Sequence, residues 1–96
     1  MSNIKAFIMK PKDNVATVLD RVEMGNEVQL AISNEQIAFI VKGIIPAGHK
    51  FAIKDIAFGQ PVVKYGETIG VATQSIMVGE HVHVHNVESC RGRGDK

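Results

Sequence analysis

The chain of 96 residues has little of several features that would assign it to a class of protein. It holds one cysteine, Cys90, so no internal disulfide can form, as in proteins of the reducing cytoplasm. No apolar run approaches the roughly 18 residues of a membrane-spanning helix, and the cluster at 6–9 is too short for a signal peptide. We therefore expect a cytoplasmic protein with no membrane partner.

An excess of charge of either sign is also missing. Eleven basic and ten acidic side chains give a net charge of +1, which provides no attraction to nucleic acid, and we expect no nucleic-acid partner. A single domain of this size can bury roughly two-thirds of its unfolded surface. The chain should therefore fold around one modest core.

The segments between the glycines and prolines are short and rich in β-formers. Lys5–Lys10 predicts a strand that Pro11 ends, and 27–32 with 36–42 predicts a hairpin connected by residues 33–35. A second hairpin is expected within 62–72, turning near Gly66. Only the segment from Asp13 to Gly25 has helical spacing, with an Asp or Asn cap before it and a glycine stop after it.

A weak repeat organises the chain. An apolar residue, two variable residues, Gly, two variable residues and a second apolar residue occur four times: VEMGNEV (22–28), IPAGHKF (45–51), IAFGQPV (56–62) and IMVGEHV (76–82). Each copy predicts a turn in which the glycine takes a positive φ before a strand begins. The unequal gaps exclude a regular solenoid and favour short strands that enter a compact, barrel-like body.

The sequence GEHVHVHN (79–86) places three histidines at alternate positions. An extended strand would put His81, His83 and His85 on one face, with β-carbons of neighbouring histidines roughly 7 Å apart, close enough to converge on one metal ion. The same alternation is typical of a half-exposed sheet face that binds nothing. The spacing leaves both interpretations open.

Three further residues are candidates for contact with a ligand. His49 and Lys50 follow a turn glycine, where a ligand could reach the imidazole and the ammonium could meet a carboxylate. Tyr65 lies beside Gly66 in the expected hairpin turn and could bind a hydroxyl. An ordinary polar turn, or packing over the turn, would explain these residues as well.

Taken together, several motifs closely resemble the small subunit, or N-terminal domain, of altronate dehydratases, in the family that includes galactarate dehydratase and the sulfolactate sulfo-lyase small subunit. They are DNVATVL (13–19), GHKFAIKDIAFGQPVVKYGETIGVAT (48–73), GEHVHVHNVES (79–89) and RGRGD (91–95). The resemblance implies a mainly β fold, a compact SAF-type β-clip domain of short strands and hairpins with one short helix, over residues 1–89. Residues 90–96 would form a flexible or docking tail.

The resemblance also implies an activity, a cofactor and roles for the candidate residues. It implies a hydro-lyase that converts D-altronate to 2-keto-3-deoxy-D-gluconate and water, with Fe(II), or alternatively Mn(II), in a site completed by a large catalytic subunit. The roles that it suggests are metal ligation for His83 and His85, catalysis for His49 and Lys50, and substrate binding for Tyr65, His81 and Asn86.

Alternatives remain on the same scaffold. The leaving group could be sulfite, as in a sulfolactate sulfo-lyase, or the substrate could be galactarate; a third alternative is a non-catalytic carbohydrate-binding module. An unpaired strand edge would also allow a homo-oligomer when the large subunit is missing.

Overall fold

The computed structural model describes residues 4–8, 10–32 and 35–89, and in these ranges the chain forms nine strands and no helix. The strands are β1 (Ile4–Phe7), β2 (Val15–Val18), β3 (Glu27–Ile32), β4 (Glu35–Ile40), β5 (Lys50–Ala52), β6 (Pro61–Lys64), β7 (Glu67–Ala72), β8 (His81–Val82) and β9 (Val87–Ser89). The expectation of a mainly β domain is confirmed.

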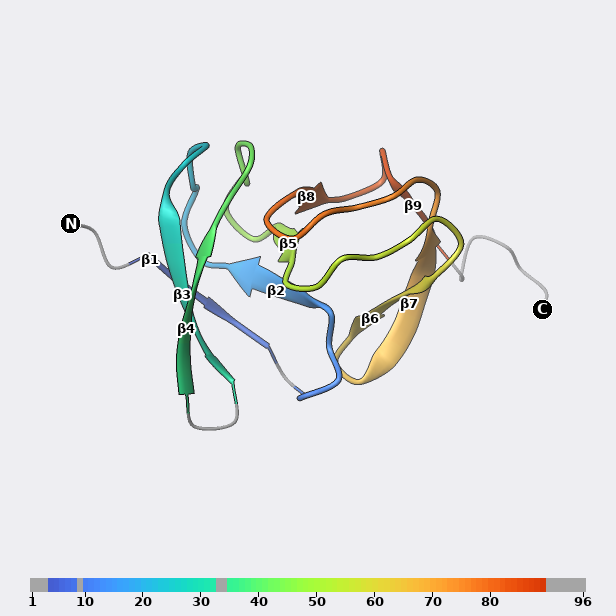
Figure 1. The fold of residues 1–96 in the computed structure, drawn as a ribbon, viewed down its shortest axis with the longest axis horizontal. Coiled ribbons are helices and arrows are strands. Elements are labelled where there is room, and N and C mark those ends of the chain that lie inside the picture. Colours follow the sequence, from blue (N-terminus) through green and yellow to red (C-terminus); the bar gives the residue numbers. More distant parts are fainter. Residues whose placement is uncertain (1–3, 9, 33–34, 90–96) are drawn as a thin grey trace.

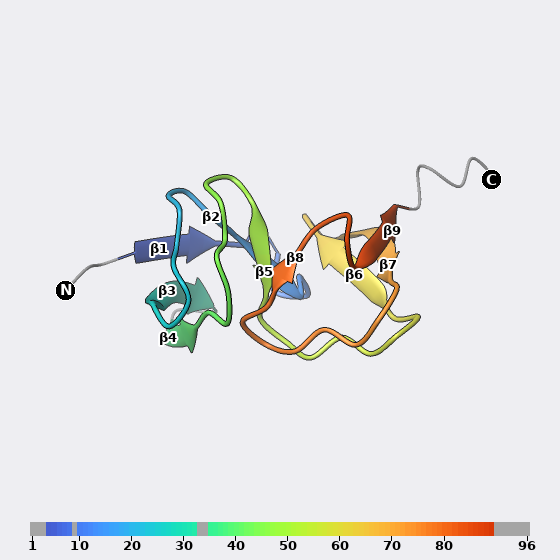
Figure 2. The same cartoon turned by 90° about the horizontal axis from the view of Figure 1, so that it is seen from above.

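The strands form two sheets that divide the molecule along its length. A six-stranded sheet has the order β4-β3-β1-β2-β5-β8, in which only β1 and β3 run parallel, and a three-stranded antiparallel sheet has the order β6-β7-β9. Figure 1 shows β1, β3 and β4 at one end and β6, β7 and β9 at the other, and Figure 2 shows β5 and β8 between them. Both expected hairpins are confirmed as β3–β4 and β6–β7.

Each copy of the glycine repeat forms a turn that leads directly into a strand. Gly25, Gly48, Gly59 and Gly79 all have positive φ, between 82° and 94°, as the repeat predicted. The first apolar residues of the four copies pair two by two as isolated bridges, Val22 with Ile45 and Ile56 with Ile76. The last apolar residues, Val28, Phe51, Val62 and Val82, are fully buried in β3, β5, β6 and β8.

Two adjoining clusters make up the core. The larger one lies among β1–β5 and includes Leu30 and Phe51, with the Phe39 ring edge-on to Phe51 at 5.9 Å between centroids. The smaller one lies under β6, β7 and β8 and includes Val62, Ile76 and Val82. Because Val15 of β2 and Ala52 of β5 belong to the smaller cluster, these two strands connect the halves of the molecule.

The short helix expected between Asp13 and Gly25 is not formed, and that prediction was wrong. Val15, Ala16 and Val18 are all buried, so β2 is covered on both faces and its sequence, VATV, lacks the regular alternation of a half-exposed strand. Such a segment cannot be distinguished from a buried helix by periodicity alone. Hydrogen-bonded pairing with β1 and β5 stabilises this segment as a strand over a helix.

The expected cap residues bind a strand and a hairpin turn instead of a helix. Asn14 Oδ1 accepts a hydrogen bond of 2.7 Å from the Val63 N–H. The buried Asp13 carboxylate accepts bonds from the backbone N–H groups of Tyr65 at 3.1 Å and Gly66 at 2.7 Å. These bonds hold the β6–β7 turn, where Tyr65 has a φ of 59° that a non-glycine residue rarely adopts.

Two predictions fall outside the described residues: any role of Cys90, and the docking tail at 90–96. Within the described ranges, no helix has the length and apolar character needed to cross a bilayer.

Candidate metal centre

Three histidine side chains converge beside the edge of the six-stranded sheet. His49, His81 and His83 each offer a ring nitrogen, and these three atoms lie within 4.8 Å of one another. His49 Nδ1 lies 2.9 Å from His81 Nε2, and the His49 and His83 rings stack with centroids 4.4 Å apart. Among the described residues this is the one group of three or more His, Cys, Asp or Glu side chains with such geometry.

Strand pairing brings His49, which is distant in sequence, to the other two. β5 and β8 pair antiparallel, with Lys50 opposite Val82 and Phe51 opposite His81. Continuing this register by one residue places His49 opposite His83. The turn before β5 is fixed on β2, because the Gly48 N–H donates to Val18 O and the Val18 N–H donates to His49 O.

The histidine row is not one long strand, which corrects the sequence prediction. β8 ends at Val82, and residues 83–86 form a turn closed by a bond from the Asn86 N–H to His83 O at 3.0 Å. The Asn86 side chain is 3 % exposed and explains the turn. Its Oδ1 accepts from the His83 N–H at 3.0 Å, and its Nδ2 donates to His81 O at 2.9 Å.

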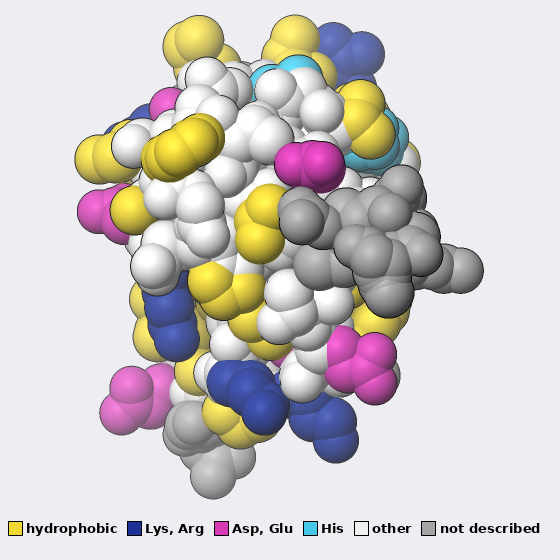
Figure 3. Space-filling view, turned by 90° about the vertical axis from the view of Figure 1, so that its right-hand side faces the viewer, with side chains coloured by type: hydrophobic (Ala, Val, Ile, Leu, Met, Phe, Trp, Pro, Cys, Tyr) yellow, Lys and Arg dark blue, Asp and Glu magenta, His cyan; other side chains and the backbone are white. Residues whose placement is uncertain are grey.

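His85 lies next to the three-histidine group without being part of it. Its ring is 5.3 Å from the His81 ring, between centroids. The structure therefore brings together His49, His81 and His83, whereas the sequence assigned the metal to His83 and His85. Figure 3 shows histidine side chains at the upper rim of the molecule, beside apolar side chains, and the three members of the cluster are half-buried.

The surroundings keep His81 and His83 neutral. Burial, followed by the charges of His49, His85, His83 and Lys50, lowers the pKa of His81 to about 4. Burial and the charges of His49, Lys50 and His85 also lower the pKa of His83. A neutral imidazole has a free nitrogen lone pair, which is the form that binds metal ions.

An apolar groove of about 270 Å³ lies on one side of the cluster. It is lined by one member of the cluster, by a lysine, by aliphatic side chains and by a serine: His83, Lys50, Ile69, Val84, Val87 and Ser89. Burial, together with the positive charge of Lys64, lowers the pKa of Lys50. This effect makes the Lys50 ammonium easier to deprotonate than an exposed one.

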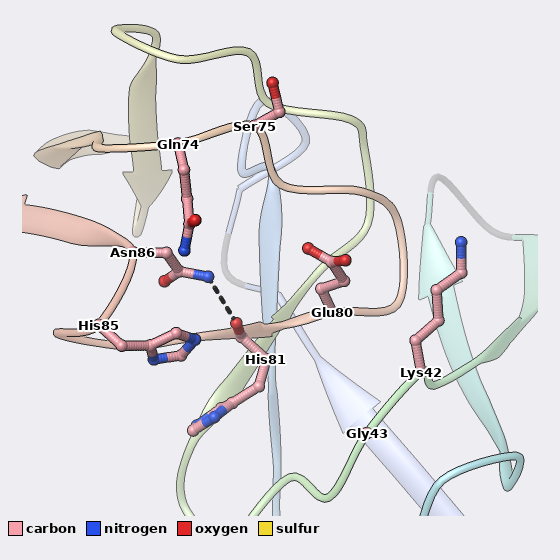
Figure 4. A pocket seen from close by; sticks show the side chains of 8 residues that line it. All are labelled: Lys42, Gly43, Gln74, Ser75, Glu80, His81, His85 and Asn86. Atoms are coloured by element: carbon pink, nitrogen blue, oxygen red, sulfur yellow. Dashed lines mark hydrogen bonds between the residues drawn. The ribbon is translucent and has the colours of Figure 1, made fainter.

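A polar pocket of about 360 Å³ lies on the other side (Figure 4). Its side chains carry charges, amides, a hydroxyl and imidazoles: Lys42, Gln74, Ser75, Glu80, His81, His85 and Asn86, with Gly43 completing the wall. The pocket shares His81 with the cluster, and the His85 ring lies beside His81 in the pocket lining (Figure 4).

Tyr65 is not brought to this site. It lies in the turn between β6 and β7, at the opposite edge of the molecule from β8 in Figure 1, and lines neither pocket. Its exposed ring receives the Lys64 ammonium at 4.7 Å from the ring centroid.

The three imidazoles fit the metal that the sequence resemblance implies. Nitrogens bound at about 2.1 Å to one ion lie about 3 Å apart at right angles and about 4 Å apart when opposite. The separations found here run from 2.9 Å for His49 and His81 up to a limit of 4.8 Å, so the most distant nitrogens would have to move toward one another to bind one ion. Imidazole suits iron, whereas manganese prefers carboxylate oxygens, so the donor set favours Fe(II) over Mn(II).

Sequence reasoning missed the grouping of His49 with His81 and His83. The available signal was the glycine repeat, because His49 and His81 both follow turn glycines that begin strands. It also missed Lys42 and Gln74, which belong to no motif, and Glu80, which lies in the GEHVHVHN motif but was given no role.

Comparisons with known proteins agree with this architecture. Residues 4–90 match the family model of the altronate/galactarate dehydratase SAF domain. The chain is 40% identical over 89 residues to the (2R)-sulfolactate sulfo-lyase subunit alpha of Chromohalobacter salexigens, covering 88% of this chain and 95% of that protein. It is 42% identical over 77 residues to the altronate dehydratase of Escherichia coli, covering 80% of this chain.

The relatives differ in how much of them the chain spans. It covers 95% of the sulfo-lyase subunit from Chromohalobacter and 87% of the corresponding subunit from Paracoccus pantotrophus. It covers only 15% of the altronate dehydratase of Escherichia coli and 17% of that of Bacillus subtilis. All four relatives are lyases by name, and the chain belongs to the altronate/galactarate dehydratase SAF domain family.

Proposed function

We propose that the chain is the small subunit of a sugar-acid hydro-lyase of the altronate dehydratase type, and that a large subunit completes its active site. The observation that carries the proposal is the group of three imidazoles, His49, His81 and His83, in a chain of this family. The two pockets beside the group would hold the substrate and a base.

In this proposal His49, His81 and His83 hold the metal ion, Fe(II) being favoured. When bound, the ion would supply Lewis acidity for the substrate carboxylate and the departing hydroxyl. Asn86 positions two of the ligands, because its buried amide bonds the backbones of both His81 and His83. His85 then contacts substrate where the cluster opens into the polar pocket.

Lys50 is the residue of this chain best placed to move a proton. It lies in the apolar groove beside His83, and burial favours its neutral amine. In the elimination, the amine would take the proton from C2 of the sugar acid. The C–H electron pair would form the C2–C3 double bond as the C3 hydroxyl leaves as water, with a proton returned by the ammonium so formed. The enol product then tautomerises to the 2-keto-3-deoxy acid.

A sulfolactate sulfo-lyase is the second candidate, favoured by a different observation. The chain spans nearly the whole of two sulfo-lyase alpha subunits, but only 15% to 17% of the altronate dehydratases. The same proton would be removed from C2, with sulfite leaving from C3. Both candidates share the histidine cluster and differ in the leaving group and in the length of the substrate beyond C3.

The experiment is anaerobic isolation of the tagged chain from its own organism, with identification of co-purifying proteins by mass spectrometry. The complex is then assayed with altronate, galactarate and sulfolactate, and both 2-keto-3-deoxy acid and sulfite are measured. Metal-dependent release of a 2-keto-3-deoxy acid supports the proposal. Sulfite release supports the second candidate, and a complex with neither activity contradicts both.

A further inference from the structure

We infer that the polar pocket is a subsite for an uncharged polyhydroxyl chain, the part of a six-carbon sugar acid that lies beyond the reacting carbons. The claim that the pocket selects the substrate rests on the proposed function. The claim that the pocket binds a ligand rests on its volume of about 360 Å³, which is within the range of small-molecule sites.

The chemistry of the walls suits hydroxyl groups. Gln74 offers an amide that both donates and accepts, and Glu80 offers a carboxylate that accepts. Figure 4 shows the two side chains projecting into the same space from different segments of the chain, with the His85 ring at one end. A hydroxyl donates one hydrogen bond and accepts others, so a row of hydroxyls matches this alternation of donors and acceptors.

The charges of the pocket cancel. Lys42 is its cation and Glu80 its carboxylate among the described residues that line it. A sulfonate or a second carboxylate would meet Glu80 as well as Lys42, and the like charge would oppose binding. An uncharged chain of hydroxyls meets no such repulsion, so the pocket favours a mono-acid over a dianion.

The pocket lies where such a chain would run. It shares His81 with the metal-binding group, and His85, which also lines the pocket, has its ring 5.3 Å from that of His81. With C1 to C3 of a sugar acid at the histidines, C4 to C6 would pass His85 toward Gln74 and Glu80. Sulfolactate has no carbon beyond C3 and would leave this space to water.

Backbone bonds between distant segments hold the walls in place. The Lys42 N–H donates to Gly79 O at 2.9 Å, next to Glu80, and the Thr73 N–H donates to Asn86 O at 2.9 Å, next to Gln74. The pocket is therefore formed before any ligand arrives, which reduces the ordering that binding must bring about.

Binding can be tested on the full chain by NMR, independently of any activity. Backbone amides and the side-chain amides of Gln74 and Asn86 are followed while altronate, galactarate or sulfolactate is added up to high millimolar concentration. Altronate should shift the signals of residues 42, 74, 75 and 80. Galactarate and sulfolactate should shift them less at equal concentration. Equal or stronger binding of either dianion overturns the inference, as does the absence of shifts with altronate.

Matched variants locate the site. Gln74→Ala should weaken altronate binding about tenfold, and Gln60→Ala, another exposed glutamine that lines neither pocket, should leave it unchanged. Glu80→Gln can keep the bond that Glu80 accepts from the Met77 N–H, and it should improve the binding of galactarate. Equal effects of Gln74→Ala and Gln60→Ala overturn the inference.

The two proposals fail separately. If altronate shifts these amides but the isolated complex has no lyase activity, the binding site stands and the proposed function fails. If the complex dehydrates altronate but Gln74→Ala and Glu80→Gln leave both the shifts and KM unchanged, the lyase stands and the subsite is refuted.

Discussion

The two pockets beside the histidine group differ in their chemistry. The difference favours proton transfer in the apolar groove and substrate binding in the polar pocket. The groove on the His83 side is lined by Ile69, Val84 and Val87 around the Lys50 amine. The pocket on the His85 side is lined by charges, amides and a hydroxyl. Aliphatic surroundings favour a neutral amine that can accept a proton, whereas polar surroundings hold and orient hydroxyl groups.

Each pocket shares one histidine with the three-histidine group. Loss of a metal-binding histidine should therefore lower the activity more than any other change. We expect His49→Ala to lower the activity of the assembled enzyme by at least about 100-fold, because one imidazole and its 2.9 Å contact with His81 disappear. Anaerobic kinetics with altronate measures this. The matched variant His85→Ala should keep more activity and change mainly KM; an equal loss in the two variants would contradict the assignment.

Removing the Lys50 amine should stop proton transfer in the apolar groove and leave the polar pocket unchanged. Lys50→Met keeps much of the aliphatic volume and should lower kcat by about 100-fold or more, the usual contribution of a general base. Metal content and altronate binding should stay as in the native protein. Lys54→Met, at an exposed lysine that lines neither pocket, is the control. Unchanged kcat in Lys50→Met would remove Lys50 from the mechanism.

The turn that precedes Glu80 of the polar pocket can be strained at one glycine. Gly79 has φ +94°, and a Cβ there would lie 2.5 Å from Ile40 O. We expect Gly79→Ala to lower the free energy of unfolding by about 3 kcal/mol. Gly25→Ala, with φ +86° and no atom within 4 Å of the added Cβ, should lower it by about 1 kcal/mol. Urea denaturation compares the two, and equal losses would show that the contact with Ile40 is unimportant.

Acid should act on the metal-free chain through His81. The folded pKa of about 4 lies below the ordinary histidine value of 6.5, so unfolding takes up a proton at this site between these pH values. Stability from this group is complete above about pH 6.5 and is lost as pH falls toward 4. NMR titration of the imidazole measures the pKa; a midpoint near 6.5 would contradict the burial argument.

Local chemistry in the sequence predicted much of the fold. The four glycine turns, both hairpins and the mainly β class follow from turn residues and β-branched runs, whose conformations depend on near neighbours. The helix prediction failed at 15–18, because burial on both faces removes the alternation that identifies a strand.

The site was harder to predict because pairing between distant segments builds it. His49 and His81 lie 32 positions apart, and only the register of β5 on β8 brings them together. The buried amide of Asn86 ends the histidine strand early, which no alternation pattern reveals. The polar pocket adds Lys42 and Gln74, which belong to no motif, to residues of the 79–86 motif, and no local pattern predicts that they meet.

The central claim is that His49, His81 and His83 hold the metal, and metal content tests it most directly. The assembled enzyme is purified anaerobically with the native chain, with His83→Ala and with His85→Ala, and iron and manganese are measured in each. We predict about one iron per small subunit in the native protein and in His85→Ala, and its loss in His83→Ala. Full metal content in His83→Ala, or its loss in His85→Ala alone, would contradict the account.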